Sequence, residues 1–195
     1  DIIMAIGTPA ARAAKNATGA IPIVGVTMGD PVQDELAESL ARPGGNVTGT
    51  TFLGPELVAK RLQLLKEIIP TLKRVAVLWH PAAYGAKTMA GMKTEIETAA
   101  RALGIELILV SVDAPKDVPS AFASMAEQKP DGFMVFPSPM LYGEYRRIVE
   151  LAAKHKALEA ELEDCMSHPA STDAEIAELK RKKRLAPVAE RLGEH

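Results

Sequence analysis

The sequence has little cysteine, few aromatic residues and no long apolar run. Cys165 is the single cysteine among 195 residues, so an internal disulfide cannot form and the fold must rest on its hydrophobic core. The longest apolar runs, such as residues 75–79, are far shorter than the ~18 residues that cross a bilayer. We therefore expect no disulfide scaffold and no membrane insertion.

The chain also lacks an excess of either charge. Its 23 Lys and Arg and 25 Asp and Glu give a formal net charge of −2, which creates no general attraction to nucleic acid or to anionic membranes. The basic run 180–184 could contact phosphates, but Glu175 and Glu178 lie nearby, and a charged helix face is the simpler interpretation. We predict no nucleic-acid partner.

Catalytic and metal-binding patterns are missing too. No Gly-x-Ser-x-Gly or Gly-x-Gly-x-x-Gly motif occurs. Cys165 and His168 lack a third residue that would orient them as a nucleophile and base. The four histidines do not have the spacing of metal ligands; they are His80, His155, His168 and His195. We predict a protein that is not an enzyme and that needs no cofactor.

With 47% hydrophobic residues, the chain should form an ordinary core. Short apolar runs alternate with turn signals and helical periodicity, which predicts an α/β protein with parallel sheets covered on both faces. Helices are expected over 56–69 and 87–103, where apolar residues recur at helical spacing. Strands are expected at 1–7, 22–27, 47–52, 75–79, 106–112 and 132–136.

Turn clusters around residues 43–46 and 54–55 and a change in composition near Lys154 predict three parts. We expect a first lobe at 1–52, a second lobe at 53–153 and a helical hairpin at 154–195. The last part holds 8 Lys and Arg and 9 Asp and Glu among 42 residues, a much higher charge density than the rest.

The hairpin prediction rests on a heptad pattern. Its apolar or aligned positions are Ile148, Leu151, His155, Leu158, Leu162 and Cys165, the spacing of a coiled-coil seam. One helix should run from about 141 to 166, and a second should start at Thr172 or Asp173 and kink or end at Pro187.

Polar residues precede proline at the ends of several predicted strands. Thr8-Pro9, Asp30-Pro31 and Ser138-Pro139 have the form of a helix N-cap followed by the first helical residue, and His80-Pro81 stands in a similar place. Helix N-termini at the carboxyl edge of a parallel sheet suit a polar or anionic ligand head. We predict a ligand cleft there, although each pair could also simply start a helix.

Aromatic residues cluster near two of these strand ends. Only 4% of the residues in the chain are aromatic. Trp79 and Tyr84 lie near the end of one predicted strand, and Phe136 and Tyr142 lie near the end of another. They could form a stacking surface for an apolar ligand group, or they could pack the core, especially Trp79 and Phe136 within strands.

Several of these segments resemble a known family. The stretches 7–15, 21–24, 29–32 and above all 39–49, Ser-Leu-Ala-Arg-Pro-Gly-Gly-Asn-Val-Thr-Gly, resemble the TrpX-like ABC-transporter substrate-binding proteins, and 60–62 and 74–79 continue the match. The resemblance covers about residues 1–155. Residues 154–192 resemble the small YdcH-like helical-hairpin proteins, although Pro187 departs from their second helix.

The resemblance implies two Rossmann-like lobes of the periplasmic-binding-protein type that close on a small solute and hand it to an ABC permease. Ligand contacts would come from Thr8, Thr27, Asp30, His80 and Ser138. Tyr84 or Tyr142 would cover an apolar part of the ligand. The resemblance also implies a periplasmic or extracellular lipoprotein. Members of that family have an export signal, an opening β-α-β segment and later strands that this sequence lacks, so we expect a chain truncated at both ends.

Our leading interpretation is a non-catalytic solute-binding protein of an ABC importer, with an amino acid, preferably aromatic, as its ligand. The alternative is an interaction scaffold that self-associates through the helical hairpin and whose α/β part no longer binds ligand. Unpaired sheet edges would favour homo-oligomers in either case. The effector domain of a transcription regulator shares the fold, but no helix-turn-helix segment accompanies it here.

Overall fold

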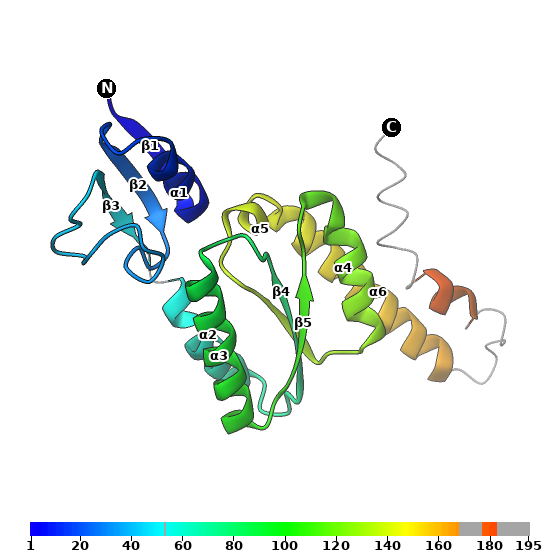
Figure 1. Ribbon diagram of the computed structural model, residues 1–195. Coiled ribbons are helices and arrows are strands. Elements are labelled where there is room, and N and C mark those ends of the chain that lie inside the picture. The colour runs from blue at the N-terminus through cyan, green and yellow to red at the C-terminus, as the bar shows by residue number, and fades with distance from the viewer. Residues whose placement is uncertain (53, 168–176, 183–195) are drawn as a thin grey trace, which may run out of the picture.

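The computed structural model describes residues 1–52, 54–167 and 177–182, and its strands form two separate parallel sheets (Figure 1). The first sheet contains β1 (Ile3–Ile6), β2 (Ile23–Met28) and β3 (Val47–Thr51), in the order β1-β2-β3. Helix α1 (Gly7–Ala17) makes the crossover between β1 and β2. We call the part of the chain built on this sheet the first lobe.

The second lobe is built on β4 (Arg74–Trp79), β5 (Glu106–Ser111) and β6 (Gly132–Val135), in the order β5-β4-β6. Helix α3 (Ala86–Leu103) connects β4 to β5, and α4 (Val118–Glu127) connects β5 to β6. The α/β prediction is therefore confirmed, and the observed strands differ from the predicted ranges by one or two residues at their ends. Helix α4 was not predicted.

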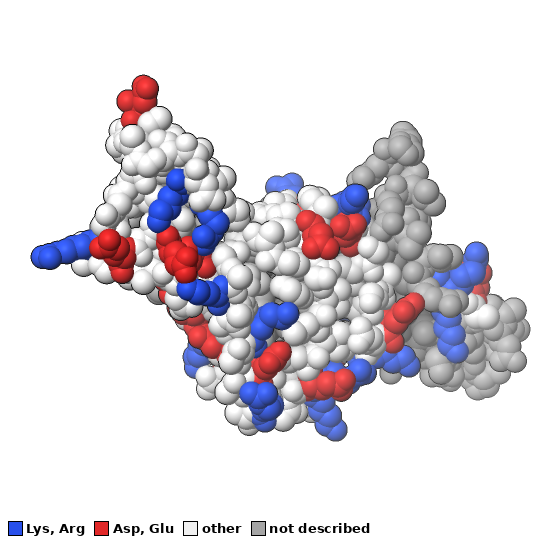
Figure 2. All heavy atoms as spheres, viewed as in Figure 1, with Lys and Arg blue, Asp and Glu red and all other residues white. Residues whose placement is uncertain are grey.

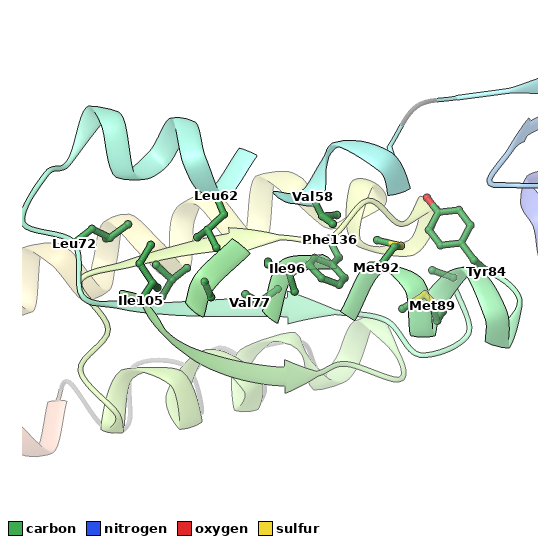
Figure 3. Packing of buried hydrophobic residues seen from close by; sticks show 13 residues of the cluster. Val58, Leu62, Leu72, Val77, Tyr84, Met89, Met92, Ile96, Ile105 and Phe136 are labelled. Carbon is green, nitrogen blue, oxygen red and sulfur yellow. The ribbon is translucent and has the colours of Figure 1, made fainter. Parts of the chain in front are cut away.

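The core of the second lobe lies on both faces of β4, because its side chains alternate. Figure 3 shows the cluster on one of these faces. Val75 and Val77 face α2 (Val58–Ile68) and α3, whereas Ala76 and Leu78 face α4 and α6 (Tyr145–Ser167). All four side chains are fully buried. Each fully buried valine or leucine contributes roughly 1.5–3 kcal/mol.

The first sheet is not covered on both faces within the described residues, contrary to prediction. Ala5, Ile23 and Val47 pack in a core with Ala11 of α1, but Met4 and Ile6 of β1 are 73% and 67% exposed. Their apolar character made β1 look like a strand buried on both sides. Among the described residues, α1 is the helix that packs against this sheet, and the side chains of β1 that face away from it are exposed.

The helix predicted from 141 to 166 is interrupted. A short helix, α5, spans Pro139–Gly143, Glu144 is its C-cap, and α6 then runs from Tyr145 to Ser167. Ile148 and Leu151, the first positions of the predicted coiled-coil seam, are buried against the second sheet instead. The apolar spacing at these two residues therefore reflects packing within the lobe.

Residues 177–182 are helical, and the predicted cap at Thr172 or Asp173 and the kink at Pro187 lie outside the described residues. The division at 52/53 and 153/154 stays a prediction. Figure 2 shows acidic and basic residues interspersed over the visible described face, without a large area of one sign.

Candidate functional site

The two lobes meet where strands end. A Cβ atom placed on Gly7, where β1 becomes α1, would lie 3.6 Å from the Pro139 ring of α5. One placed on Gly29, directly after β2, would lie 2.6 Å from the Tyr84 ring, which follows β4. The carboxyl ends of β1, β2, β4 and β6 thus converge, as parallel sheets with a shared ligand-binding edge require. We call this region the lobe junction.

Thr8 lies inside the first lobe at this junction. It is 1% exposed, and its Oγ1 accepts a hydrogen bond of 3.0 Å from the Gly29 N–H. The expected N-cap role is wrong at this position, because α1 already begins at Gly7 with Ile6 as its N-cap. The hydroxyl instead ties the start of α1 to the end of β2.

Asp30 caps a turn rather than a helix. Its Oδ1 accepts hydrogen bonds of 2.9 Å and 3.0 Å from the N–H groups of Val32 and Gln33. Turn geometry follows from residue 31 on, so the capping chemistry was predicted correctly but the helix was not. The Asp30 side chain is half-buried, and both of these hydrogen bonds go to the same carboxylate oxygen.

Thr27 has an unusual backbone conformation. Its φ of 53° lies in the left-handed region, which β-branched residues rarely adopt, and the pairing of β2 with β3 shifts register at this point. Its N–H donates to Oγ1 of Thr50 at 3.3 Å, and its side chain is exposed. The strand therefore bends just before the junction.

His80 and Ser138 are the corresponding residues of the second lobe. The Nδ1 atom of His80 lies 2.9 Å from the Val112 carbonyl oxygen, which holds the ring against the end of β5. A turn follows His80, not the expected helix. Ser138 does act as an N-cap, because its Oγ accepts from the Leu141 N–H of α5 at 3.4 Å.

The two candidate aromatic contacts differ sharply in exposure. Tyr84 is 6% exposed, its ring lies near Phe52 with centroids 6.3 Å apart, and its buried hydroxyl has no hydrogen-bond partner among the described residues. Burial raises the pKa of this hydroxyl. Figure 3 shows Tyr84 at the junction end of the second core. Tyr142 is 78% exposed and stacks on Tyr145.

Trp79 and Phe136, the other two aromatics of the predicted surface, belong to the second core. Phe136 is 1% exposed, and Trp79 is partly buried against the same cluster with Lys93 Nζ 4.0 Å from its ring. The core-packing interpretation therefore holds for both.

Sequence reasoning missed the polar contacts that cross the junction. Asp34 of the first lobe accepts hydrogen bonds from Gly85 and Thr88 of the second, and Lys87 Nζ lies 2.5 Å from Glu35 Oε1. The hydrogen bond and charge of Lys87 lower the pKa of Glu35. Asp34 lies in a polar turn sequence, and no local pattern distinguishes it from the exposed residues beside it.

A small pocket of about 40 Å³ lies beside these contacts. Asp30 and Gln33 line it from the first lobe, and Glu56, Thr88 and Met92 from the second. Ligand pockets usually measure about 300–1,000 Å³, so this space is much smaller than a typical small-molecule site.

No group of three or more potential metal ligands occurs within the described part of the chain. In the same residues, no helix combines the length and apolar character that a membrane span requires.

Comparison with known proteins gives consistent matches. The family model described as "ABC transporter substrate binding protein" matches residues 1–158. A tyrosine-binding protein of Clostridioides difficile is 42% identical over 88 residues, which are 45% of this chain and 25% of that protein.

Two solved structures share the fold. One is an ABC domain in complex with L-Trp from Streptococcus pneumoniae, with a TM-score of 0.66 and 24% identity over 77% of this chain and 50% of that one. The other is a conserved domain protein from Vibrio cholerae, with a TM-score of 0.59 and 35% identity over 68% of this chain and 43% of that one. This chain thus spans half or less of each relative's length.

The family match takes in both lobes and extends into α6. On this evidence the chain belongs to the ABC transporter substrate-binding protein family.

Proposed function

We propose that this chain is the solute-binding part of an ABC-type importer and binds a small molecule in the cleft between its lobes. The observation that carries the proposal is the convergence of strand ends at the lobe junction, which brings polar side chains of both lobes to one edge. Binding proteins of this family are not enzymes, and we propose no catalysis here. The partner would be an ABC permease, and the location periplasmic or extracellular.

An amino acid, preferably an aromatic one, is the proposed ligand. The curated relative is named for binding tyrosine, and its aligned part is 42% identical to this chain. Asp30 would accept from the ammonium group, with Thr8, Thr27, His80 and Ser138 as further polar contacts. Tyr84 and the exposed Tyr142 would contact the aromatic ring. Because the present pocket is small, binding requires the lobes to separate and close again.

A thermal melt with and without single amino acids tests the proposal. At about 100 times its dissociation constant, a ligand adds about 2.7 kcal/mol to the free energy of unfolding and raises Tm. We expect L-Tyr or L-Trp to raise Tm and L-Glu to leave it unchanged. A cooperative melt that none of the twenty amino acids moves would contradict an amino-acid ligand.

Asp30→Asn examines the site itself, because the amide oxygen can still accept from Val32 and Gln33 while the negative charge is lost. We expect the Kd measured by calorimetry to rise about 10- to 150-fold, as for a lost hydrogen bond to a charged group. Glu127→Gln makes the same charge change at an exposed residue of α4 and should leave the Kd unaltered. An unaltered Kd in Asp30→Asn would remove Asp30 from the site.

A further inference from the structure

Asp34 is a buried carboxylate on the first lobe. It lies in the turn that follows β2 and is only 2% exposed. Burying a carboxylate is costly unless hydrogen bonds compensate for the lost hydration. The partners of Asp34 therefore show what this residue does.

Both partners of its carboxylate belong to the second lobe. Oδ1 accepts a hydrogen bond of 2.9 Å from the Thr88 hydroxyl, and Oδ2 accepts one of 3.1 Å from the Gly85 N–H. Gly85 is the N-cap of α3 and has no capping side chain of its own. Because α3 is 18 residues long, its N-terminus carries a partial positive charge that favours a carboxylate.

The main chain of Asp34 is held as well. Its carbonyl oxygen accepts a hydrogen bond from the Arg12 guanidinium of α1. A Cβ atom on Gly85 would lie 2.1 Å from Asp34 Oδ1, so the two lobes approach as closely as a glycine allows. The turn that carries Asp34 is thus fixed to its own lobe while its side chain holds the other.

We propose that Asp34 is a latch that holds the two lobes together. The neighbouring Glu35–Lys87 pair also crosses the junction, but both side chains are more than 60% exposed, and exposed pairs contribute little. Asp34 instead accepts from one buried donor, the Thr88 hydroxyl, and one half-buried donor, the Gly85 N–H, so its loss leaves both without their acceptor.

The latch has a consequence for access to the pocket. Thr88 lines the 40 Å³ pocket, so the lobes cannot separate there unless the Asp34 hydrogen bonds break. The fraction of molecules with open lobes then limits how fast a solute can enter. Weakening the latch should raise the association rate of a solute.

The distance between two spin labels, one on each lobe, tests the latch without any ligand. Asn16→Cys on α1 and Glu97→Cys on α3 provide exposed positions, with Cys165→Ser to remove the natural thiol. Asp34→Asn keeps the side-chain volume, but its amide has a single acceptor oxygen. It therefore cannot accept hydrogen bonds from both Thr88 and Gly85 as the two carboxylate oxygens do. Short distances between the labels come from molecules whose lobes are in contact, and long distances from molecules whose lobes are apart. In Asp34→Asn we expect the ratio of the first population to the second to fall roughly tenfold.

Glu35→Gln is the matched control. It removes one negative charge at the residue next to Asp34, and with it the ion pair with Lys87 that also crosses the junction. It should leave the distances as they are. Thr88→Val and Gly85→Ala attack the latch from the other lobe, the first by removing the hydroxyl and the second by displacing Oδ1, and both should act like Asp34→Asn.

Unchanged distances in Asp34→Asn and Thr88→Val would overturn the proposal, as would an equal change in Glu35→Gln. If Asp34→Asn fails to melt cooperatively, the distances in Thr88→Val test the latch instead. Valine has nearly the shape of threonine, so this change removes the hydroxyl with little effect on packing. The outcome does not depend on whether an amino acid binds, so failure of the latch and failure of the proposed function are told apart.

Discussion

At the residue scale, Thr27 is the clearest sign of strain. A threonine with φ of 53° pays a conformational cost that glycine does not, because its Cβ is crowded there. Such outliers gather at binding sites, and this one stands at the end of β2 beside the lobe junction. The family resemblance also pointed to Thr27.

Replacing Thr27 by glycine should therefore stabilise the protein by up to about 1 kcal/mol, or leave it unchanged. Chemical denaturation measures the free energy of unfolding. Thr48→Gly, at an exposed position of β3 in ordinary strand geometry, is the control and should destabilise by about 0.5–1 kcal/mol. Equal destabilisation by both changes would show that Thr27 is not strained.

At the element scale, Asp131 fixes the start of β6 next to the start of β4. Its Oδ2 accepts hydrogen bonds of 2.7 Å and 2.9 Å from the N–H groups of Lys73 and Arg74. These backbone hydrogen bonds lower the pKa of Asp131. A carboxylate thus holds the register of two strands that lie 57 residues apart in sequence.

Because the pKa is lower in the folded state, the charged form of Asp131 stabilises the fold at any pH above the pKa in the unfolded chain. That contribution is lost as pH falls through the folded pKa. Comparing the free energy of unfolding of the natural protein and Asp131→Asn from pH 7 to pH 3 should show a difference that is constant near neutrality and shrinks below about pH 4. A difference that stays constant to pH 3 would contradict this role.

On the scale of the whole molecule, the C-terminal part should be separable from the lobes. Among the described side chains of α6, those buried in the second core are Ile148 and Leu151, near the start of that helix. We expect a chain of residues 1–155 to melt cooperatively and to keep its ligand response. Loss of the cooperative melt would show that later residues complete the core.

Light scattering on the full and shortened chains decides about the scaffold alternative. If the hairpin drives assembly, the full chain forms oligomers at tens of micromolar and the shortened chain is a monomer. If the full and the shortened chain have the same oligomeric state, assembly through residues 156–195 is ruled out. The solute-binding proposal expects this second result.

The sequence by itself determined the α/β class, the six described strands and the family. Apolar runs and helical spacing arise from local burial, and they can be read without knowing which segments meet. Ser138 and Asp30 were identified in the same way, because capping of nearby N–H groups is a local interaction. Thr8 was identified as a polar strand-end residue, but its partner Gly29 lies 21 residues away.

Only the tertiary structure decided which of these local patterns face one another. Met4 and Ile6 are apolar yet exposed, because no described helix covers their side of the first sheet. Ile148 and Leu151 match a coiled-coil seam yet pack against a sheet. Asp34 resembles any polar turn residue until α3 of the other lobe brings Gly85 and Thr88 to its carboxylate, a contact over more than 50 residues that no local signal encodes.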